Sequence, residues 1–205
     1  MSSMDALLPA RISPRITIRH FQPGDEPRLL QIANNPNIAR NLTTMFPHPY
    51  TLADAEFWVA ANRLKTSPED TGPAVPRQRH FSYAVEIDGQ LGGAGGFTLL
   101  GDYRARTAEI GYWLGEEYWG QGIATAVAAW VVESVRATQG DVVRVEAAVF
   151  EGNEGSRRVL EKCGFVREGI QRAAGYRKER GVFDVWMMAL VWDDRVEAER
   201  TEARE

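Results

Sequence analysis

The sequence has few residues with which to build a cross-linked or metal-organised scaffold. Its 205 residues include one cysteine, Cys163, which excludes an internal disulfide and a zinc site made of several thiolates. The three histidines, His20, His48 and His80, lie far apart and show no metal-ligand spacing. No apolar run approaches the ~20 residues that cross a membrane, and the first fifteen residues do not resemble a secretory signal. We therefore expect a cytoplasmic protein with no metal site and no membrane contact.

An excess of positive charge is also absent. The chain has 24 lysines and arginines against 28 acidic residues, a formal net charge of −4. Direct nucleic-acid binding is disfavoured, because it depends on neutralising phosphates. The 44% hydrophobic and 25% charged fractions are ordinary for a globular protein, and the length suits one domain. We expect a flexible arm over residues 1–14, one folded domain over 15–192 and a charged tail over 193–205.

The apolar pattern predicts a mixed α/β (α+β) fold. Alternating apolar residues favour strands over residues 15–20, 80–87, 91–100, 106–114, 142–150, 165–171 and 182–192. Helical spacing favours helices over residues 29–33, 51–65, 121–138 and 153–162. Proline-rich segments 37–50 and 66–79 are expected to be connections. Three successive strands precede the first strand–helix crossover, which favours a mostly antiparallel sheet of six to seven strands with about four helices.

The most informative segment is the junction between the strand expected at 106–114 and the helix that follows it. Gly120 and Gly122 lie there, and glycine lets a ligand approach the backbone closely. The start of the helix offers free N–H groups and the positive end of the helix dipole, which together bind phosphate. The junction lacks the signatures of the P-loop and of the dinucleotide fold. A tight turn is the alternative explanation of these glycines.

The glycine cluster at residues 92–96 has a different context. It follows a predicted hairpin turn and no helix comes after it. Glycine inside a strand marks a bulge or the close approach of another backbone. We therefore interpret this cluster as a closely approached strand, with a possible second role as the floor of a substrate groove.

Several segments resemble the GNAT superfamily of acetyl-CoA-dependent N-acetyltransferases. The strand AEIGYWL followed by YWGQGIAT (118–125) is similar to the superfamily's motif A, and NEGSRRVLEKCGF (153–165) to a later strand-to-helix motif. FPHPYTLADAEFW (46–58) and FDVWMMAL (183–190) resemble the RimJ/RimL-type branch, which acetylates the N-termini of ribosomal proteins. The resemblance covers roughly residues 15–192. In the usual loop pattern, [Gln/Arg]-x-x-Gly-x-[Gly/Ala], Gly122 and Ala124 match and Trp119 departs.

The resemblance implies that acetyl-CoA is the co-substrate and that no metal takes part. It also implies that a strand bend near Gly111 exposes backbone to the pantetheine arm. Many members place a tyrosine general acid where this chain has Leu160, so a tyrosine mechanism at that position is excluded. The implied cofactor-binding residues are Tyr112, Trp113, Leu114, Trp119, Gly120, Gln121, Gly122, Ile123, Ala124, Thr125, Asn153, Ser156 and Arg157.

Three residues are the candidate catalytic groups. Glu109 is the candidate general base, acting through a water; a solvent-facing or salt-bridged glutamate is the alternative. Ser156 is the candidate hydrogen-bonding partner of the departing sulfur, and Asn153 would hold the pantetheine arm or an ordered water. Asn153 and Ser156 also suit the first turn of a helix, so capping is the alternative for both. A backbone N–H near residues 112–114 would hold the oxyanion.

The expected activity is direct transfer of an acetyl group to a primary amine. A protein N-terminal α-amine is the expected acceptor, and a small-molecule amine such as a polyamine, an aminoglycoside or an amino-acid derivative is the alternative. A CoA-binding module without catalysis is a second alternative. The basic turn with Arg172, Arg177, Lys178 and Arg180 is either a solvated hairpin tip or attracts an acidic acceptor or a ribosomal surface. A homodimer is plausible.

Overall fold

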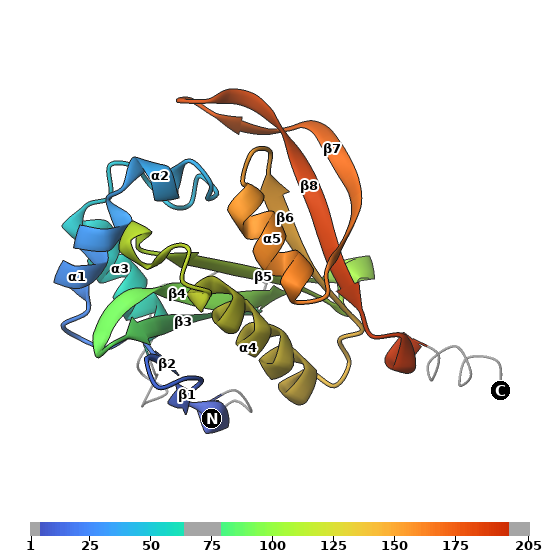
Figure 1. Ribbon diagram of the computed structural model, residues 1–205, viewed down its shortest axis with the longest axis horizontal. Helices are drawn as coiled ribbons and strands as arrows, with labels where there is room; N and C mark the ends of the chain where they lie inside the picture. The colour runs from blue at the N-terminus through green and yellow to red at the C-terminus, as the bar shows by residue number, and fades with distance from the viewer. Residues whose placement is uncertain (1–4, 64–78, 197–205) are drawn as a thin grey trace.

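The computed structural model describes residues 5–63 and 79–196 (Figure 1). Eight strands, most of them segments in which apolar residues alternate, are hydrogen-bonded into one mixed sheet. The order across the sheet is β1-β2-β3-β4-β5-β6-β8-β7. All neighbouring pairs are antiparallel except β5 and β6. The strands are β1 (Ala10–Arg11), β2 (Ile16–Arg19), β3 (Arg79–Ile87), β4 (Gln90–Leu99), β5 (Thr107–Leu114), β6 (Arg144–Phe150), β7 (Val166–Arg177) and β8 (Gly181–Val191).

Five α-helices and three short 3₁₀ turns accompany the described part of the sheet. The helices are α1 (Glu26–Ala33), α2 (Pro36–Ala39), α3 (Leu52–Asn62), α4 (Ile123–Thr138) and α5 (Glu154–Lys162). The 3₁₀ turns are η1 (Asp5–Leu7), η2 (Asp102–Arg104) and η3 (Glu116–Tyr118). The side chain of Thr51 accepts a hydrogen bond from the Asp54 N–H and that of Asp54 from the Thr51 N–H, which fixes the start of α3. None of the described helices is long and apolar enough to span a membrane.

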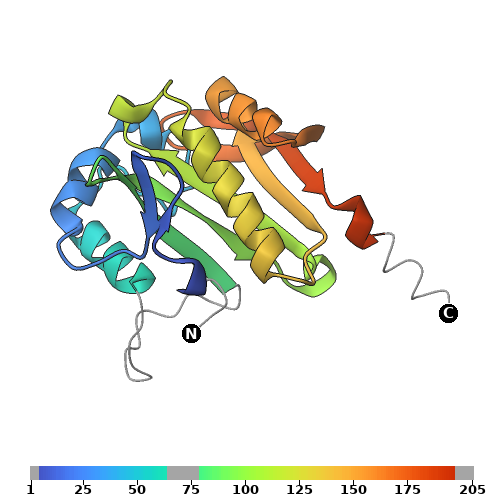
Figure 2. The same cartoon turned by 60° about the horizontal axis from the view of Figure 1, so that its bottom comes forward.

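Apolar clusters cover the two faces of the sheet. Helix α4 crosses one face of the sheet (Figure 2). Its residues Val127, Val131 and Val135 pack against the strands, and α5 adds the fully buried Leu160 to the same cluster. On the other face, α1 and α3 pack against Ala84 and the β4 residues Leu91 and Ala94. Burying one such aliphatic side chain fully contributes about 1.5–3 kcal/mol. The helices are therefore fixed to the sheet by their apolar faces, which in turn fixes the loops at their ends.

The glycine-rich β4 is a closely approached strand, as its sequence predicts. A Cβ at Gly96 would collide with the carbonyl oxygen of Phe81 on β3, and one at Gly93 with that of Trp113 on β5. Glycine at these positions lets β4 lie between its two neighbours. The cluster does not line the cleft described below, so the suggested groove floor is not found there.

The fold class agrees with the expected mixed sheet, and the differences are local. The sheet has eight strands because residues 10–11, inside the expected arm, pair with β2. The expected connection 37–50 contains the end of the four-residue α2, which starts at Pro36. Strand β7 continues to Arg177, six residues beyond its expected end. Residues 193–196 form a helical turn, and most of segment 66–79 lies outside the described residues.

The single parallel pair positions the site. The register between β5 and β6 covers only residues 107–109 of β5 and 144–146 of β6. Beyond these residues the two strands diverge, and β6 continues beside β8 (Figure 1). The centre of the sheet therefore opens into a fork between the second half of β5 and the end of β6.

Candidate active site

A cleft of about 610 Å³ occupies the fork between β5 and β6. Its walls are β5 from Glu109 onward, the start of α4, the β6–α5 turn with the first turn of α5, and the loop after α2. Of the residues expected at the site, it contains Glu109, Tyr112, Trp113, Leu114, Trp119, Gly120, Gly122, Ile123, Ala124, Thr125, Asn153 and Ser156. The structure thus brings together segments separated by more than forty positions in the sequence.

The edge of β5 that faces the cleft offers backbone hydrogen-bonding groups. The Leu100 N–H bonds the Thr107 carbonyl and the Gly115 N–H bonds the Gly92 carbonyl, so the odd-numbered residues of β5 pair with β4. Antiparallel ladders alternate, so the even-numbered residues direct their N–H and C=O groups to the other side. There β6 has diverged, and Tyr112 and Leu114 face the cleft. The indole of Trp119 donates to the Leu114 carbonyl at 2.9 Å.

The start of α4 forms one end of the cleft and directs backbone N–H groups into it. Gly122, the N-cap, has a φ of +77°, and Gly120 has a φ of +73°. This left-handed conformation is open to glycine and turns the chain into the helix. The first intrahelical hydrogen bond runs from the Ala126 N–H to the Gly122 carbonyl, which leaves the N–H groups of residues 123–125 directed outward. No acidic residue lies in this first turn.

Two of the expected cofactor-binding residues, Gln121 and Arg157, do not line the cleft. Gln121 accepts a hydrogen bond from Arg15 and donates to the Glu117 carbonyl. Arg157 pairs with Glu154 and Glu161, one turn away on either side along α5. Such i,i+3 and i,i+4 pairs hold a side chain against its own helix. Arg158 lines the cleft in its place.

Glu109 lies at the point of the fork, half-buried and facing the cleft. Burial raises the pKa of its carboxyl group, and the nearby charge of Arg104 partly opposes that shift. Its register partner on β6 is Glu146, which is 4% exposed and pairs with both Arg104 and Arg144. Among the described residues no cation lies within ion-pair distance of Glu109. The salt-bridge explanation therefore applies to Glu146 and not to Glu109.

Ser156 and Asn153 face the cleft from the first turn of α5. The Asn153 side chain accepts a hydrogen bond from the Ser156 N–H at 3.1 Å, so Asn153 is the N-cap of the helix. The Ser156 hydroxyl lies 3.0 Å from the hydroxyl of Tyr112, which is also 3.3 Å from the Ser156 carbonyl oxygen. Capping accounts for Asn153, whereas the Ser156 hydroxyl remains directed at β5 across the cleft.

The hydroxyl of Tyr112 makes a contact with Ser156 that the sequence did not indicate. Burial raises its pKa, and the hydrogen bond with Ser156 opposes that shift only in part, so the phenol stays protonated. It joins β5 to α5 across the fork. The contact depends on how the two strands diverge, and no local pattern reveals that. The loop residues 41–43 also line the cleft. The sequence did not predict them as site residues, because their position depends on how distant segments pack.

Cys163 does not have the environment of a nucleophile. Its thiol lies 3.7 Å from the Thr125 carbonyl oxygen, and burial raises its pKa. A thiol with a raised pKa carries little thiolate at neutral pH. Across residues 5–63 and 79–196, histidine, cysteine and carboxylate side chains nowhere form a group of three suited to a metal ion.

Comparisons with known proteins agree on one family. The model of the acetyltransferase (GNAT) domain matches residues 15–166. The chain is 31% identical over 172 residues, 81% of this chain and 86% of the relative, to the putative ribosomal N-acetyltransferase YdaF of Bacillus subtilis (strain 168). It is 33% identical over 112 residues to the uncharacterized N-acetyltransferase p20 of Bacillus licheniformis. That second match covers 54% of this chain and 61% of the relative.

Solved structures show the same fold. The ribosomal L7/L12 alpha-N-protein acetyltransferase RimL, in complex with coenzyme A, superimposes with a TM-score of 0.69 over 89% of this chain and 97% of that chain, at 22% identity. The microcin C7 self-immunity acetyltransferase MccE, in complex with acetyl-CoA and AMP, gives 0.70 over 88% and 94%, at 18% identity. The family model, the curated relatives and the fold agree, and the chain belongs to the GNAT family of N-acetyltransferases.

Proposed function

We propose that this enzyme transfers an acetyl group from acetyl-CoA to the α-amine of a protein N-terminus. The observation that carries the proposal is the fork between β5 and β6, with Glu109 at its point and no cation of the described chain at ion-pair distance from its carboxyl group. YdaF is named as a putative ribosomal N-acetyltransferase and RimL as an alpha-N-protein acetyltransferase. These names support an N-terminal acceptor for this chain.

The cleft has the features that acetyl-CoA requires. The outward N–H groups at the start of α4 suit its pyrophosphate, because they combine free donors with the positive end of the helix dipole. The outward N–H and C=O of Tyr112 and the outward N–H of Leu114 suit the amides of the pantetheine arm, since the Leu114 carbonyl already accepts from the Trp119 indole. The bound co-substrate supplies a thioester, whose carbonyl carbon the amine attacks.

Glu109 accepts the proton that the amine must lose, directly or through a water. A base is most effective when its pKa is close to the working pH, and burial moves the pKa of Glu109 in that direction. An α-amine has a pKa of about 8 and a lysine amine about 10.4, so a carboxylate suits the α-amine better. An outward N–H of β5 holds the oxyanion, and the Ser156 hydroxyl donates to the departing sulfur.

The test compares two amines within one peptide. The acceptor is a peptide with a free N-terminal serine and one internal lysine, and its control is the same peptide with a blocked N-terminus. We expect acetylation of the N-terminal amine, located by mass-spectrometric fragmentation, and little reaction of the blocked peptide. Acetylation of the lysine at a similar rate would contradict an α-amine acceptor. Reaction only with free polyamines, aminoglycosides or amino-acid derivatives would favour a small-molecule enzyme.

A further inference from the structure

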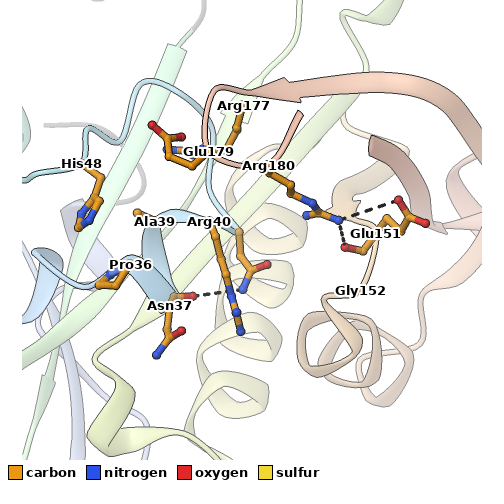
Figure 3. A pocket seen from close by; sticks show the side chains of 11 residues that line it. Pro36, Asn37, Ala39, Arg40, His48, Glu151, Gly152, Arg177, Glu179 and Arg180 are labelled. Atoms are coloured by element: carbon orange, nitrogen blue, oxygen red, sulfur yellow. Dashed lines mark hydrogen bonds and ion pairs between the residues drawn. The ribbon is translucent and has the colours of Figure 1, made fainter. Parts of the chain in front are cut away.

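A second pocket of about 540 Å³ opens beside the cleft, between α2 with its following loop and the β7–β8 hairpin (Figure 3). We call it the side pocket. Three arginines line it, Arg40, Arg177 and Arg180, against two carboxylates, Glu151 and Glu179. The side pocket and the cleft have in common the lining residues Asn37, Arg40, Asn41 and Gly152. A molecule whose amine lies near the fork can therefore extend into the side pocket.

Arg177 is a buried cation without an anionic partner. It is 8% exposed, and its Nη1 donates to the carbonyl oxygens of Leu42 and Thr43, the latter at 3.2 Å. Within the described ranges it has no carboxylate at ion-pair distance, and its Nε and Nη2 have no acceptor. A buried guanidinium ordinarily has a counter-ion. The two carbonyls fix one edge of the guanidinium, which leaves the other edge for a ligand.

The other two arginines of the side pocket, Arg180 and Arg40, differ in their ion-pair partners. Arg180 donates to the backbone carbonyl of Glu151, and its guanidinium lies 4.0 Å from that carboxylate (Figure 3). Arg40 is exposed and, over the part of the chain that the structure describes, forms no ion pair. Hydrogen bonds from Asn35 and Asn37 lower the pKa of Glu116, and the charge of Arg40 adds to that effect only from a distance. Within the described residues Arg40 and Arg177 thus form no ion pair, and the three arginines of the side pocket outnumber its two carboxylates by one.

We propose that Arg40 and Arg177 bind a carboxylate of the acceptor, so that the enzyme prefers N-terminal peptides with Asp or Glu shortly after the reacting amine. The inference rests on the proposed function and adds the acceptor's charge to it. Guanidinium groups bind carboxylates through paired N–H donors, and a fixed guanidinium loses little freedom when it does so. The carbonyls that hold Arg177 belong to residues 42 and 43, which line the cleft. The carboxylate site is therefore built onto the wall of the active site.

The experiment compares two amidated peptides, Ser-Glu-Glu-Ala-Ala-Gly and Ser-Gln-Gln-Ala-Ala-Gly, which differ only in charge. We expect kcat/KM to be on the order of tenfold higher for the acidic peptide, because charge-assisted hydrogen bonds are the strong ones. The preference should shrink as salt rises. It should also shrink in Arg40→Gln and in Arg177→Lys, which keeps the charge but loses the paired donors. Arg172→Gln, an exposed arginine of β7 outside both pockets, is the matched control and should keep the preference.

A binding measurement separates the two claims. The N-acetylated forms of both peptides are titrated into the CoA-loaded enzyme, and their dissociation constants are measured by calorimetry, which needs no turnover. Tighter binding of the acidic peptide that Arg40→Gln removes supports the carboxylate site, even if no peptide is acetylated and the proposed function fails. Equal binding of both peptides, or a preference that Arg172→Gln reduces as much as Arg40→Gln, overturns the inference. N-terminal acetylation at equal rates for both peptides overturns it while the proposed function stands.

Discussion

Two glutamates that are neighbours across the fork have opposite environments. Glu146 is almost fully buried and holds two arginines, whereas Glu109 faces the cleft with no cation at ion-pair distance in the described chain. An ion-paired carboxylate is a poor proton acceptor, and a desolvated unpaired one is a good one. The two glutamates therefore differ because the arginines reach Glu146 and, in the described chain, do not pair with Glu109.

Replacing Glu109 should abolish most turnover without changing the affinity for acetyl-CoA. We expect Glu109→Gln to lower kcat by about 100-fold or more, the usual contribution of a general base. Acetyl-CoA affinity measured by calorimetry should change less than about twofold, since binding rests on backbone groups. Glu133→Gln, an exposed residue of α4, is the control and should retain wild-type kcat. Retained turnover in Glu109→Gln would remove Glu109 from the mechanism.

The raised pKa of Glu109 also predicts how activity and stability depend on pH. The wild-type kcat/KM should rise as pH rises through the pKa of Glu109 in the folded protein, and Glu109→Gln should lack that rise. A raised carboxyl pKa favours the folded state below the unfolded pKa, and this contribution is lost as pH rises through the folded pKa. Denaturant titrations should therefore find Glu109→Gln at least as stable as wild type at pH 8.

The hydroxyl pair Tyr112–Ser156 should contribute measurably to holding the fork. Removing the phenol hydroxyl in Tyr112→Phe deletes its contacts at 3.0 and 3.3 Å with Ser156. We expect a loss of about 1 kcal/mol in the free energy of unfolding, the usual contribution of one buried hydrogen bond. Tyr103→Phe serves as control, because Tyr103 is 90% exposed. Equal stability of the two variants would show that the contact is not formed in solution.

At the scale of elements, the site depends on how α4 begins. The helix has no acidic side chain in its first turn, and its N-cap, Gly122, has no side chain that could accept a hydrogen bond from the first N–H groups. The first N–H groups therefore stay available, whereas in α3 the Thr51 side chain accepts from the Asp54 N–H and the Asp54 side chain accepts from the Thr51 N–H. The start of α4 therefore differs from that of α3 in having no side chain that occupies its first N–H groups.

Gly122→Ala tests the junction. A Cβ at Gly122 meets nothing within 4 Å, so the cost is the left-handed φ of +77°. We expect about 1 kcal/mol of lost stability and an acetyl-CoA Kd raised several-fold, because the strained turn shifts the N–H groups. In the control, Gly140→Ala, the position is equally open and has no positive φ, so no comparable loss is expected. The idea fails if both variants bind acetyl-CoA as tightly as wild type.

At the scale of the whole molecule, the two apolar clusters share one sheet and should unfold together. Leu29 of α1 and Leu160 of α5 are both fully buried but belong to clusters on opposite faces. We expect Leu29→Ala and Leu160→Ala each to cost about 2–5 kcal/mol. Tryptophan fluorescence and far-ultraviolet circular dichroism should give coincident denaturation curves in both variants. Separate transitions would show that the faces unfold independently.

The sequence predicts most elements of this fold, because they have strong apolar periods. It predicts the open junction at Gly120 and Gly122, since glycine spacing is local information. It does not predict β1 or α2, because elements of two and four residues have no measurable period. The family resemblance implies that Arg157 binds the cofactor, whereas in the structure its side chain pairs with Glu154 and Glu161 of the same helix. The direction of a helical arginine side chain depends on its neighbours in the folded protein. The side pocket joins residues more than 130 positions apart, which no local pattern reveals.

Calorimetric titration decides whether the fork between β5 and β6 holds acetyl-CoA. The wild-type protein is titrated with acetyl-CoA and CoA, with ATP and NAD as controls, and Gly122→Ala is titrated in parallel. The account predicts saturable binding of both CoA forms at one site per chain, much weaker binding of ATP and NAD, and a weakened response in Gly122→Ala. Absence of binding to either CoA form would contradict the account, and the glycine junction would then be only a turn.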